Sequence, residues 1–237
     1  MNPETTTPSA LGPGLSIEGF GLAVHTRQGS VLSDISVSVA SGEILGISGA
    51  EGTGRTSLCL VLCGRMKFRS GTLDVGGEPM PKRMRWLRAN SVLAPTGDLY
   101  GLEGALRVRE EIRRTLKLTG RKNTRLSSSQ VLETAGLVGQ ERTLVRDLPV
   151  VTRRRLEIVC AFADKARLVV VDDLQQGIPY AHQPEIWRFL KELANESGAT
   201  VVATCLDAEP ANDWCDQVLR IDETSPTPST LSAGEAT

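Results

Sequence analysis

The feature that most constrains the fold is a glycine-rich segment, Gly49–Ser57, set between two apolar runs. It matches the spacing G-x-x-x-x-G-x-[ST]. The preceding Glu43–Ser48 is typical of a buried strand, and the following Leu58–Cys63 of a buried helix. This order predicts a phosphate-binding loop, in which backbone N–H groups and a helix N-terminus face an anion. A glycine-rich turn without a ligand is the alternative interpretation.

One position of this loop departs from the motif, because Arg55 stands where the phosphate-binding lysine belongs. A guanidinium stays cationic and binds phosphate oxygens, but it is a planar fork rather than a compact charge. Thr56 is placed to ligate Mg²⁺. The expected nucleotide-binding residues are Gly49, Gly52, Thr53, Gly54, Arg55, Thr56 and Ser57.

A second apolar run, Leu168–Val171, ends in two acids, Asp172 and Asp173. Its continuous β-branched character is typical of a central parallel strand that is buried on both faces. Carboxylates at the C-terminal end of such a strand lie in the crevice where open α/β sheets bind ligands. Asp172 is therefore the expected carboxylate partner of Thr56 at a Mg²⁺ site.

Composition narrows the class of protein. With 237 residues, 40% of them hydrophobic, the chain is expected to form one globular domain, or two lobes at most. Its net charge of −1 gives no global electrostatic field that would indicate nucleic acid or a membrane as a partner. No apolar run reaches the roughly 18 residues of a membrane span. The odd number of cysteines favours reduced thiols in the cytosol; they are Cys59, Cys63, Cys160, Cys205 and Cys215.

The domain is expected over 15–222, between Pro/Ser/Thr-rich tails at 1–14 and 223–237 that we expect to be disordered. Further strands are expected within Leu15–Val39 (with a loop at His25–Ser30), Gly71–Val75, Ser91–Ala94, Thr200–Thr204 and Val218–Ile221. Further helices are expected at Val108–Leu118, Ser127–Gly136, Thr152–Lys165 and Pro184–Asn195.

Residues 82–125 carry a strong excess of basic over acidic side chains. Two interpretations stay open for this segment. It forms a solvated helical surface, or its basic face binds an anionic partner.

The order of these segments resembles the ATP-binding subunit of an ABC transporter, from about Leu15 to Asp222. More narrowly, GEILGISGAEGTGRTSL (Gly42–Leu58) and QQGIPYAHQPEIWRFLKELA (Gln175–Ala194) are similar to the second ATPase half of ribose/xylose-type sugar importers. The resemblance implies an α/β P-loop NTPase of ABC ATPase type. Such a fold has a mainly parallel core sheet with helices, a small antiparallel β lobe and a helical subdomain, here at about 85–160. It also implies ATP and Mg²⁺ as cofactors.

The chain departs from this family at several motifs. The signature L-S-G-G-[QN] is matched by Leu148, Pro149, Val150, Val151 and Thr152. Asp173 stands at the position of the Glu that polarises the attacking water, and Cys205 at that of the switch histidine. The Q-loop position falls near 94–96 without a glutamine, the D-loop Asp corresponds to Pro179, and only His25 could stack on adenine.

The resemblance therefore implies a degenerate subunit that binds ATP and hydrolyses it weakly or not at all. The implied partners are a second ABC ATPase subunit, a heterodimer being favoured over a homodimer, and the transmembrane subunits of a permease. No nucleic acid is expected. The implied location is the cytoplasmic face of the cell membrane, as a peripheral protein. The alternatives are a slow but active ATPase, in which Asp173 is the base, and a regulatory module that binds anionic partners through residues 82–125.

Overall fold

The computed structural model describes residues 13–26, 29–96, 101–119 and 124–221. The expected tails therefore lie outside the described residues, apart from Pro13 and Gly14. Within the described ranges, no helix is long and apolar enough to cross a membrane.

A parallel sheet forms the centre of the molecule, with strand order β6-β7-β8-β3-β9. Its strands are β6 (Ser91–Leu93), β7 (Leu168–Val171), β8 (Thr200–Cys205), β3 (Ile44–Ser48) and β9 (Gln217–Arg220). Every residue of β7, β8 and β3 is buried, as expected for central strands covered on both faces. The C-terminal ends of β3, β7 and β8 consequently lie side by side at one edge.

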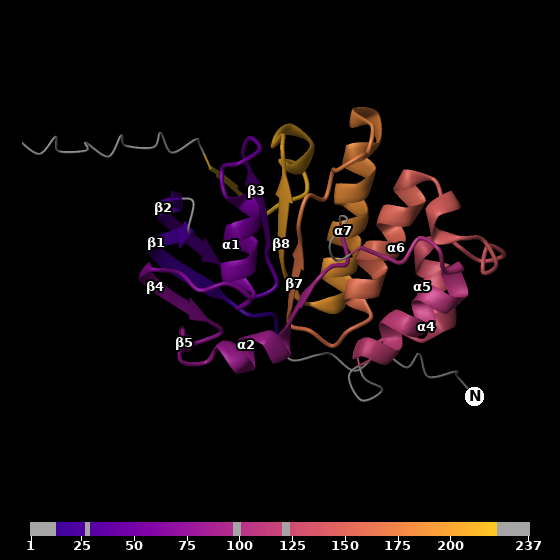
Figure 1. Cartoon of the computed structure of the whole chain (residues 1–237), viewed down its shortest axis with the longest axis horizontal. Coiled ribbons are helices and arrows are strands. Elements are labelled where there is room, and N and C mark those ends of the chain that lie inside the picture. The colour runs from indigo at the N-terminus through magenta and orange to yellow at the C-terminus, as the bar shows by residue number, and fades with distance from the viewer. Residues whose placement is uncertain (1–12, 27–28, 97–100, 120–123, 222–237) are drawn as a thin grey trace, which may run out of the picture.

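A second sheet is antiparallel, with strand order β2-β1-β4-β5, and lies at one end of the molecule (Figure 1). Its strands are β1 (Ile17–Thr26), β2 (Gly29–Val39), β4 (Ser70–Val75) and β5 (Glu78–Met80). The bounds of the loop expected at His25–Ser30 are too wide, because His25 pairs with Ser30 and Thr26 with Gly29 across β1 and β2; residues 27–28 lie outside the described residues. Polar residues at the end of a two-stranded ladder resemble a loop in sequence, since neither face of the ladder is buried there.

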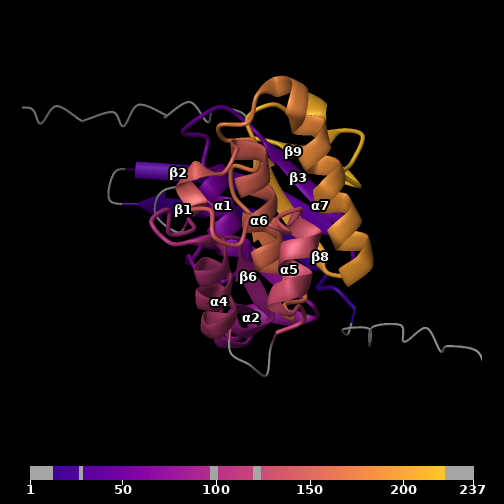
Figure 2. The ribbon, with the colours of Figure 1, turned by 90° about the vertical axis from the view of Figure 1, so that its right-hand side faces the viewer.

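Helices cover both faces of the parallel sheet. The α-helices among the described residues are α1 (Arg55–Leu62), α2 (Met84–Asn90), α4 (Val108–Thr119), α5 (Ser128–Ala135), α6 (Val150–Phe162) and α7 (Gln183–Ser197). Figure 2 shows α5, α6 and α7 in front of the parallel sheet. The expected 85–160 helical segment contains α4, α5 and part of α6, whereas β6 within it pairs with β7 in the central sheet.

The hydrophobic core has two parts because alternate residues of the central strands face opposite sides. Val169 and Val171 of β7 pack into the cluster with α6 and α7. Leu168 and Val170 pack into the cluster with α1 and the antiparallel sheet. The parallel sheet thus joins the two layers and holds the C-terminal ends of its strands in fixed register.

Helix α6 begins two residues earlier than the sequence pattern predicts, at Val150 instead of Thr152. Pro149 precedes it with φ −52° and ψ 142°, a conformation that suits the residue before a helix. The helix ends at Phe162 rather than Lys165. The predicted start was wrong because β-branched Val150 and Val151 favour strands in isolation, whereas here they form the first helical turn.

Candidate functional site

The glycine-rich loop joins β3 to α1 as a tight turn. Gly52 and Gly54 have φ values of 84° and 93°, in the left-handed region that favours glycine. A Cβ at Gly49 would lie 2.5 Å from the Ile221 carbonyl oxygen, so no side chain fits there. The Thr53 hydroxyl donates to the Ala50 carbonyl oxygen at 2.9 Å and braces the turn. The residues from Gly49 to Ser57 therefore form a compact backbone cradle at the start of α1.

Arg55 extends from this cradle toward the acid that follows β7. Its Nη1 atom lies 2.9 Å from Asp173 Oδ1, and the Arg55 side chain is 8% exposed. The contact is an ion pair rather than an aligned hydrogen bond, since Nη1 makes no hydrogen bond within the part of the chain that the structure describes. Burial raises the pKa of the Asp173 carboxyl, and the Arg55 guanidinium partly opposes that rise.

The two acids lie on a strained turn that is held by β8. Asp173 has φ 45°, which is uncommon for a residue other than glycine. Its N–H donates to Thr204 Oγ1 at 2.7 Å, and Thr204 Oγ1 donates to Asp172 Oδ1 at 2.6 Å. Leu174 N–H also donates to the Thr204 carbonyl oxygen at 2.9 Å. Strain of this kind is maintained by surrounding bonds and is frequent at functional sites.

Arg55 and Asp173 line a cavity of about 580 Å³, a size within the usual range for small-molecule sites. The cradle contributes Glu51, Gly52, Arg55 and Thr56 to the lining. The β7 and β8 sides contribute Asp173, Gln175, Gln176, Gly177, Ile178, Tyr180, Gln183, Cys205, Leu206 and Asp207. Thr56 is exposed to solvent at the start of α1. The Tyr180 hydroxyl donates to Glu209 Oε2 at 2.6 Å, so the segment after Asp173 is tied to the segment after β8.

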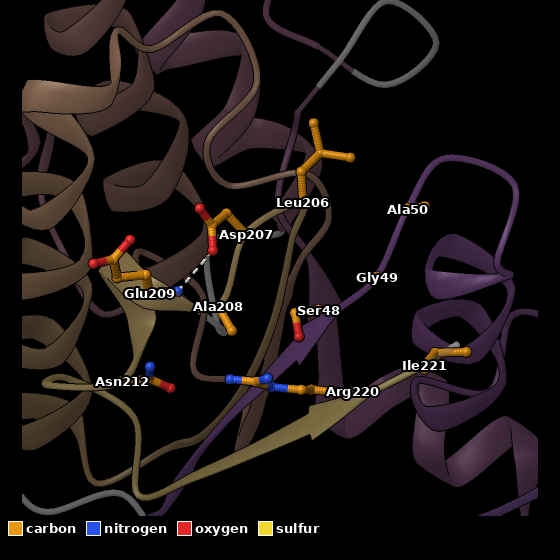
Figure 3. Close-up of a pocket in the computed structure, with 10 residues that line it drawn as sticks. All are labelled: Ser48, Gly49, Ala50, Leu206, Asp207, Ala208, Glu209, Asn212, Arg220 and Ile221. Carbon is orange, nitrogen blue, oxygen red and sulfur yellow. Dashed lines mark hydrogen bonds between the residues drawn. The ribbon is translucent and has the colours of Figure 1, made fainter. Parts of the chain in front are cut away.

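A second cavity, of about 520 Å³, lies on the other side of the loop after β8. Figure 3 shows the Arg220 side chain extending toward Asn212, with Asp207 and Glu209 on the same side of the view as Asn212. Asp207 Oδ1 accepts the Glu209 N–H at 2.9 Å, which shapes this wall. Leu206 and Asp207 line both cavities, so the segment after Cys205 separates them.

The residues at the signature position, Leu148–Thr152, lie at the N-terminus of α6. Among the described residues no side chain caps this helix, and Val150 is 40% exposed. The hydroxyl and glycine backbone that the family motif would supply at Pro149–Val151 are therefore missing. Arg154, which is nearly fully buried, donates from Nη2 to the Gln176 carbonyl oxygen at 3.1 Å. That bond connects α6 to the loop that follows Asp173.

Cys205 ends β8 beside Ser48 of β3, in the parallel register of the two strands. Burial raises the pKa of its thiol to about 12, so the thiol is neutral at pH 7. A neutral thiol is a weak hydrogen-bond donor and gives little charge stabilisation.

The structure also shows where the residues at the Q-loop position and at the expected adenine-stacking position lie. Ala94 N–H donates to the Val170 carbonyl oxygen at 2.7 Å, which places 94–96 beside the end of β7. His25 is exposed near the end of the β1–β2 hairpin. A Cβ at Gly54 would lie 2.7 Å from Leu32 Cδ2, so this hairpin packs directly against the loop.

Four of the basic side chains of 82–125 are paired with acids among the residues that the structure describes. Arg83 lies 3.0 Å from Glu78, and Arg114 makes a 2.7 Å hydrogen bond to Glu111. Arg107 and Arg109 both lie within 4 Å of Glu110 (3.8 and 3.9 Å). These pairs reduce the net charge that the segment presents and favour the solvated-surface interpretation.

Mg-ATP fits the residues that are present. The backbone cradle at the N-terminus of α1 and the buried Arg55 guanidinium, whose Nη1 makes no hydrogen bond among the described residues, supply the positive groups that an anion site requires. Thr56 and Asp172 are the oxygen donors that would hold Mg²⁺, which prefers hard oxygen ligands. The arrangement is that of a P-loop nucleotide-binding domain. The sequence profile described as "ABC transporter" matches residues 32–176, well over half of the chain. The protein belongs to the ABC transporter family and has the fold of its ATPases.

Curated relatives agree with this assignment. The chain is 29% identical over 194 residues to the Nod factor export ATP-binding protein I of Cupriavidus metallidurans, covering 81% of this chain and 63% of that protein. It is 26% identical over 211 residues to the uncharacterized ABC transporter ATP-binding protein YdbJ of Bacillus subtilis, covering 88% of this chain and 66% of that protein. The chain therefore spans less than two thirds of the length of these relatives.

A solved structure shows the same fold. CbiO1 from Clostridium perfringens, described as part of the ABC transporter complex cbiONQ, has a TM-score of 0.70 and 20% identity, with 86% of this chain and 84% of that chain covered. These proteins are not sugar-importer halves. The comparisons thus support the ABC transporter resemblance and do not support its narrower sugar-importer form.

Four contacts at the site were missed by sequence reasoning: the Thr204 bridge to both acids, the Arg154 bond to Gln176, the Tyr180–Glu209 bond and the Arg55–Asp173 ion pair. Each joins segments that are far apart in the chain. For the Thr204 bridge, the sequence offers one signal, which is a threonine at the end of an apolar strand.

Proposed function

We propose that this chain is an ATP-binding subunit of an ABC transporter that holds Mg-ATP and hydrolyses it weakly or not at all. The observation that carries the proposal is the ion pair between Arg55 and Asp173. Asp173 stands where the family's water-polarising acid belongs, and its carboxylate is engaged by the cation of the phosphate loop. A general base must reach its water within about 3 Å, and Asp is one methylene shorter than Glu.

Two further positions support the proposal that hydrolysis is impaired. The α6 N-terminus offers Pro149 and Val150 where a hydroxyl and glycine N–H groups would face the phosphate of an opposing subunit. Cys205 offers a neutral thiol at the switch position. Bound Mg²⁺ would neutralise phosphate charge, and this chain's own residues, Thr56 and Asp172, would hold it.

The same features favour a different chain as the partner. In a homodimer every composite site would combine the Pro149–Thr152 signature position with Asp173. Pairing with an intact ATPase subunit would give two unequal composite sites. One would combine the partner's normal loop and acid with the altered signature position of this chain. The other would combine Arg55 and Asp173 of this chain with the partner's normal signature. We propose such a heterodimer beneath a permease, at the cytoplasmic face of the membrane.

The test is calorimetric titration of the purified chain with Mg-ATP, together with copurification from native membranes. Binding that weakens at least tenfold in Thr56→Ala, and recovery of a permease and a second ATPase subunit, support the proposal. A chain that binds no nucleotide even with its partner present would contradict the ATP-binding role and leave a structural one. A slow but active ATPase predicts instead that Asp173→Ala abolishes single-turnover hydrolysis at this chain's own loop.

A further inference from the structure

Thr204 lies directly behind the two acids and bonds to both of them. It belongs to β8, and its side chain is fully buried. Its hydroxyl donates to Asp172 Oδ1 at 2.6 Å and accepts the Asp173 N–H at 2.7 Å. A threonine hydroxyl has one donor and two acceptor sites. The single donor of Thr204 is therefore committed to the Asp172 carboxylate.

The backbone of Thr204 holds the same turn. Its carbonyl oxygen accepts the Leu174 N–H at 2.9 Å, next to the Asp173 bond. Asp173 has φ 45°, a conformation that side chains other than glycine rarely adopt. Two adjacent N–H groups are thus anchored to one residue of the neighbouring strand, and this turn places Asp173 Oδ1 at 2.9 Å from Arg55 Nη1.

We propose that Thr204 is a positioning residue for both acids. Its hydroxyl orients the Asp172 carboxylate toward a divalent cation and keeps the Asp173 backbone in the left-handed turn that sets its carboxylate against Arg55. The part that concerns Asp172 rests on the proposed Mg-nucleotide function. The part that concerns the Asp173 turn rests on the structure of the chain alone.

The informative variant is Thr204→Val, which removes the hydroxyl and keeps the β-branched shape. It leaves the Asp173 N–H without its acceptor and the Asp172 carboxylate without its donor. Loss of a residue that orients a metal ligand typically weakens metal affinity by about 10- to 100-fold. We expect a loss of this size in the Mg²⁺-dependent part of nucleotide affinity. Thr204→Ser keeps the hydroxyl and should restore most of it.

Thr200 provides a matched control. It lies at the other end of β8, is equally buried, and its hydroxyl accepts the Gly42 N–H at 2.9 Å. Thr200→Val therefore removes a hydroxyl and a backbone hydrogen bond from the same strand, far from the acids. A purely structural effect of losing a buried hydroxyl should appear in both valine variants.

The experiment measures binding of the non-hydrolysable analogue AMP-PNP by calorimetry, with Mg²⁺ and with EDTA, for the wild type and the three variants. Amide hydrogen exchange at Asp173 and Leu174 is measured in the same chains without ligand. We expect Thr204→Val to lose the gain in affinity due to Mg²⁺, to keep its affinity in EDTA, and to exchange faster at Asp173. Thr204→Ser and Thr200→Val should match the wild type.

The proposal is overturned if Thr204→Val keeps the full Mg²⁺ gain with unchanged exchange at Asp173. It is also overturned if Thr204→Val and Thr200→Val lose affinity equally, with and without Mg²⁺. A wild-type chain that binds no AMP-PNP would contradict the nucleotide-binding function itself. The exchange rate at Asp173 would then decide by itself whether Thr204 holds the turn.

Discussion

Arg55 Nη1 and Asp173 Oδ1 lie 2.9 Å apart, and each is the other's ion-pair partner among the residues that the structure describes. The cation comes from the phosphate loop, and the carboxylate comes from the turn after the central strand β7. In the proposed function, a phosphate oxygen of the nucleotide would share this guanidinium with Asp173. The proposed weak hydrolysis would then follow in part from the replacement of the usual lysine by arginine.

The ion pair predicts a pKa change at Asp173. Burial raises the pKa of this carboxyl, and the positive charge of Arg55 opposes the rise, so Arg55→Ala should raise the pKa further. Carboxyl ¹³C NMR titration measures this directly. Arg146→Ala, which alters an exposed arginine distant from the site in sequence, serves as the control and should leave the pKa unchanged. An Asp173 pKa that falls or stays constant in Arg55→Ala would show that the two charges do not interact.

Repair of the signature position should raise ATP hydrolysis at the composite site that uses the partner's phosphate loop. Replacing Pro149–Thr152 by Ser-Gly-Gly-Gln gives the N-terminus of α6 a hydroxyl and unhindered N–H groups, which stabilise developing charge on an opposing phosphate. We expect higher ATPase activity in the complex of this chain with its partner subunit, dependent on the partner's catalytic acid. Asp173→Glu should affect only the site built on Arg55 and Thr56. If the added activity is lost through Thr56→Ala here but survives the equivalent change in the partner, the assignment of the sites is reversed.

The bond between Tyr180 and Glu209 predicts an unusual tyrosine titration. This hydrogen bond to Glu209 is the main cause that raises the pKa of Tyr180 to about 12. Ultraviolet titration of the wild type against Tyr180→Phe isolates its signal from that of Tyr100, the other tyrosine of the chain. Glu209→Gln should return the pKa toward about 10. A normal titration of Tyr180 in the wild type would mean that the loops after Asp173 and Cys205 are not joined in solution.

The hydrogen-bonded carboxylate of Asp216 predicts that the folded chain loses part of its stability in acid. Burial disfavours its charge, but hydrogen bonds from Lys191 Nζ (2.8 and 2.9 Å) and the Ile44 N–H (2.8 Å) outweigh this and lower its pKa. A lowered native pKa contributes stability that is present above the unfolded value of about 3.9 and is lost as the pH falls through the native value. Asp216→Asn should lower the free energy of unfolding at pH 7 by about 1 kcal/mol.

Chemical denaturation between pH 7 and pH 3 measures the contribution of Asp216. The difference between the wild type and Asp216→Asn should shrink as the pH falls below about 4. Asp213→Asn, an exposed acid three residues away, is the matched control and should change the unfolding free energy little at either pH. A difference that grows on acidification would contradict the assignment of the ion pair with Lys191.

Sequence patterns predicted the elements whose signals are local. The strand before the loop Gly49–Ser57 and the helix after it were predicted because glycine spacing and apolar runs indicate such elements directly. Leu168–Val171 is a central strand because its continuous β-branched run suits burial on both faces. Ser127 and Gly136 cap α5 as their residue types predict.

Contacts between distant segments were not available from the sequence. The Arg55–Asp173 pair joins α1 to the end of β7, and Thr204 reaches Asp172 from a neighbouring strand. Such pairings depend on the strand order β7-β8-β3, which is a property of the folded sheet. The start of α6 was placed wrongly because helix packing overrides the strand preference of Val150 and Val151.

We propose that this chain binds Mg-ATP without turning it over efficiently, and ATP turnover by the isolated chain is the decisive measurement. ATP hydrolysis is measured at a Mg-ATP concentration that calorimetry shows to be saturating, for the wild type and for Thr56→Ala as the binding-deficient control. We expect the wild type, although saturated, to release no more phosphate than the Thr56→Ala control. Robust turnover by the wild type that Thr56→Ala abolishes would contradict it.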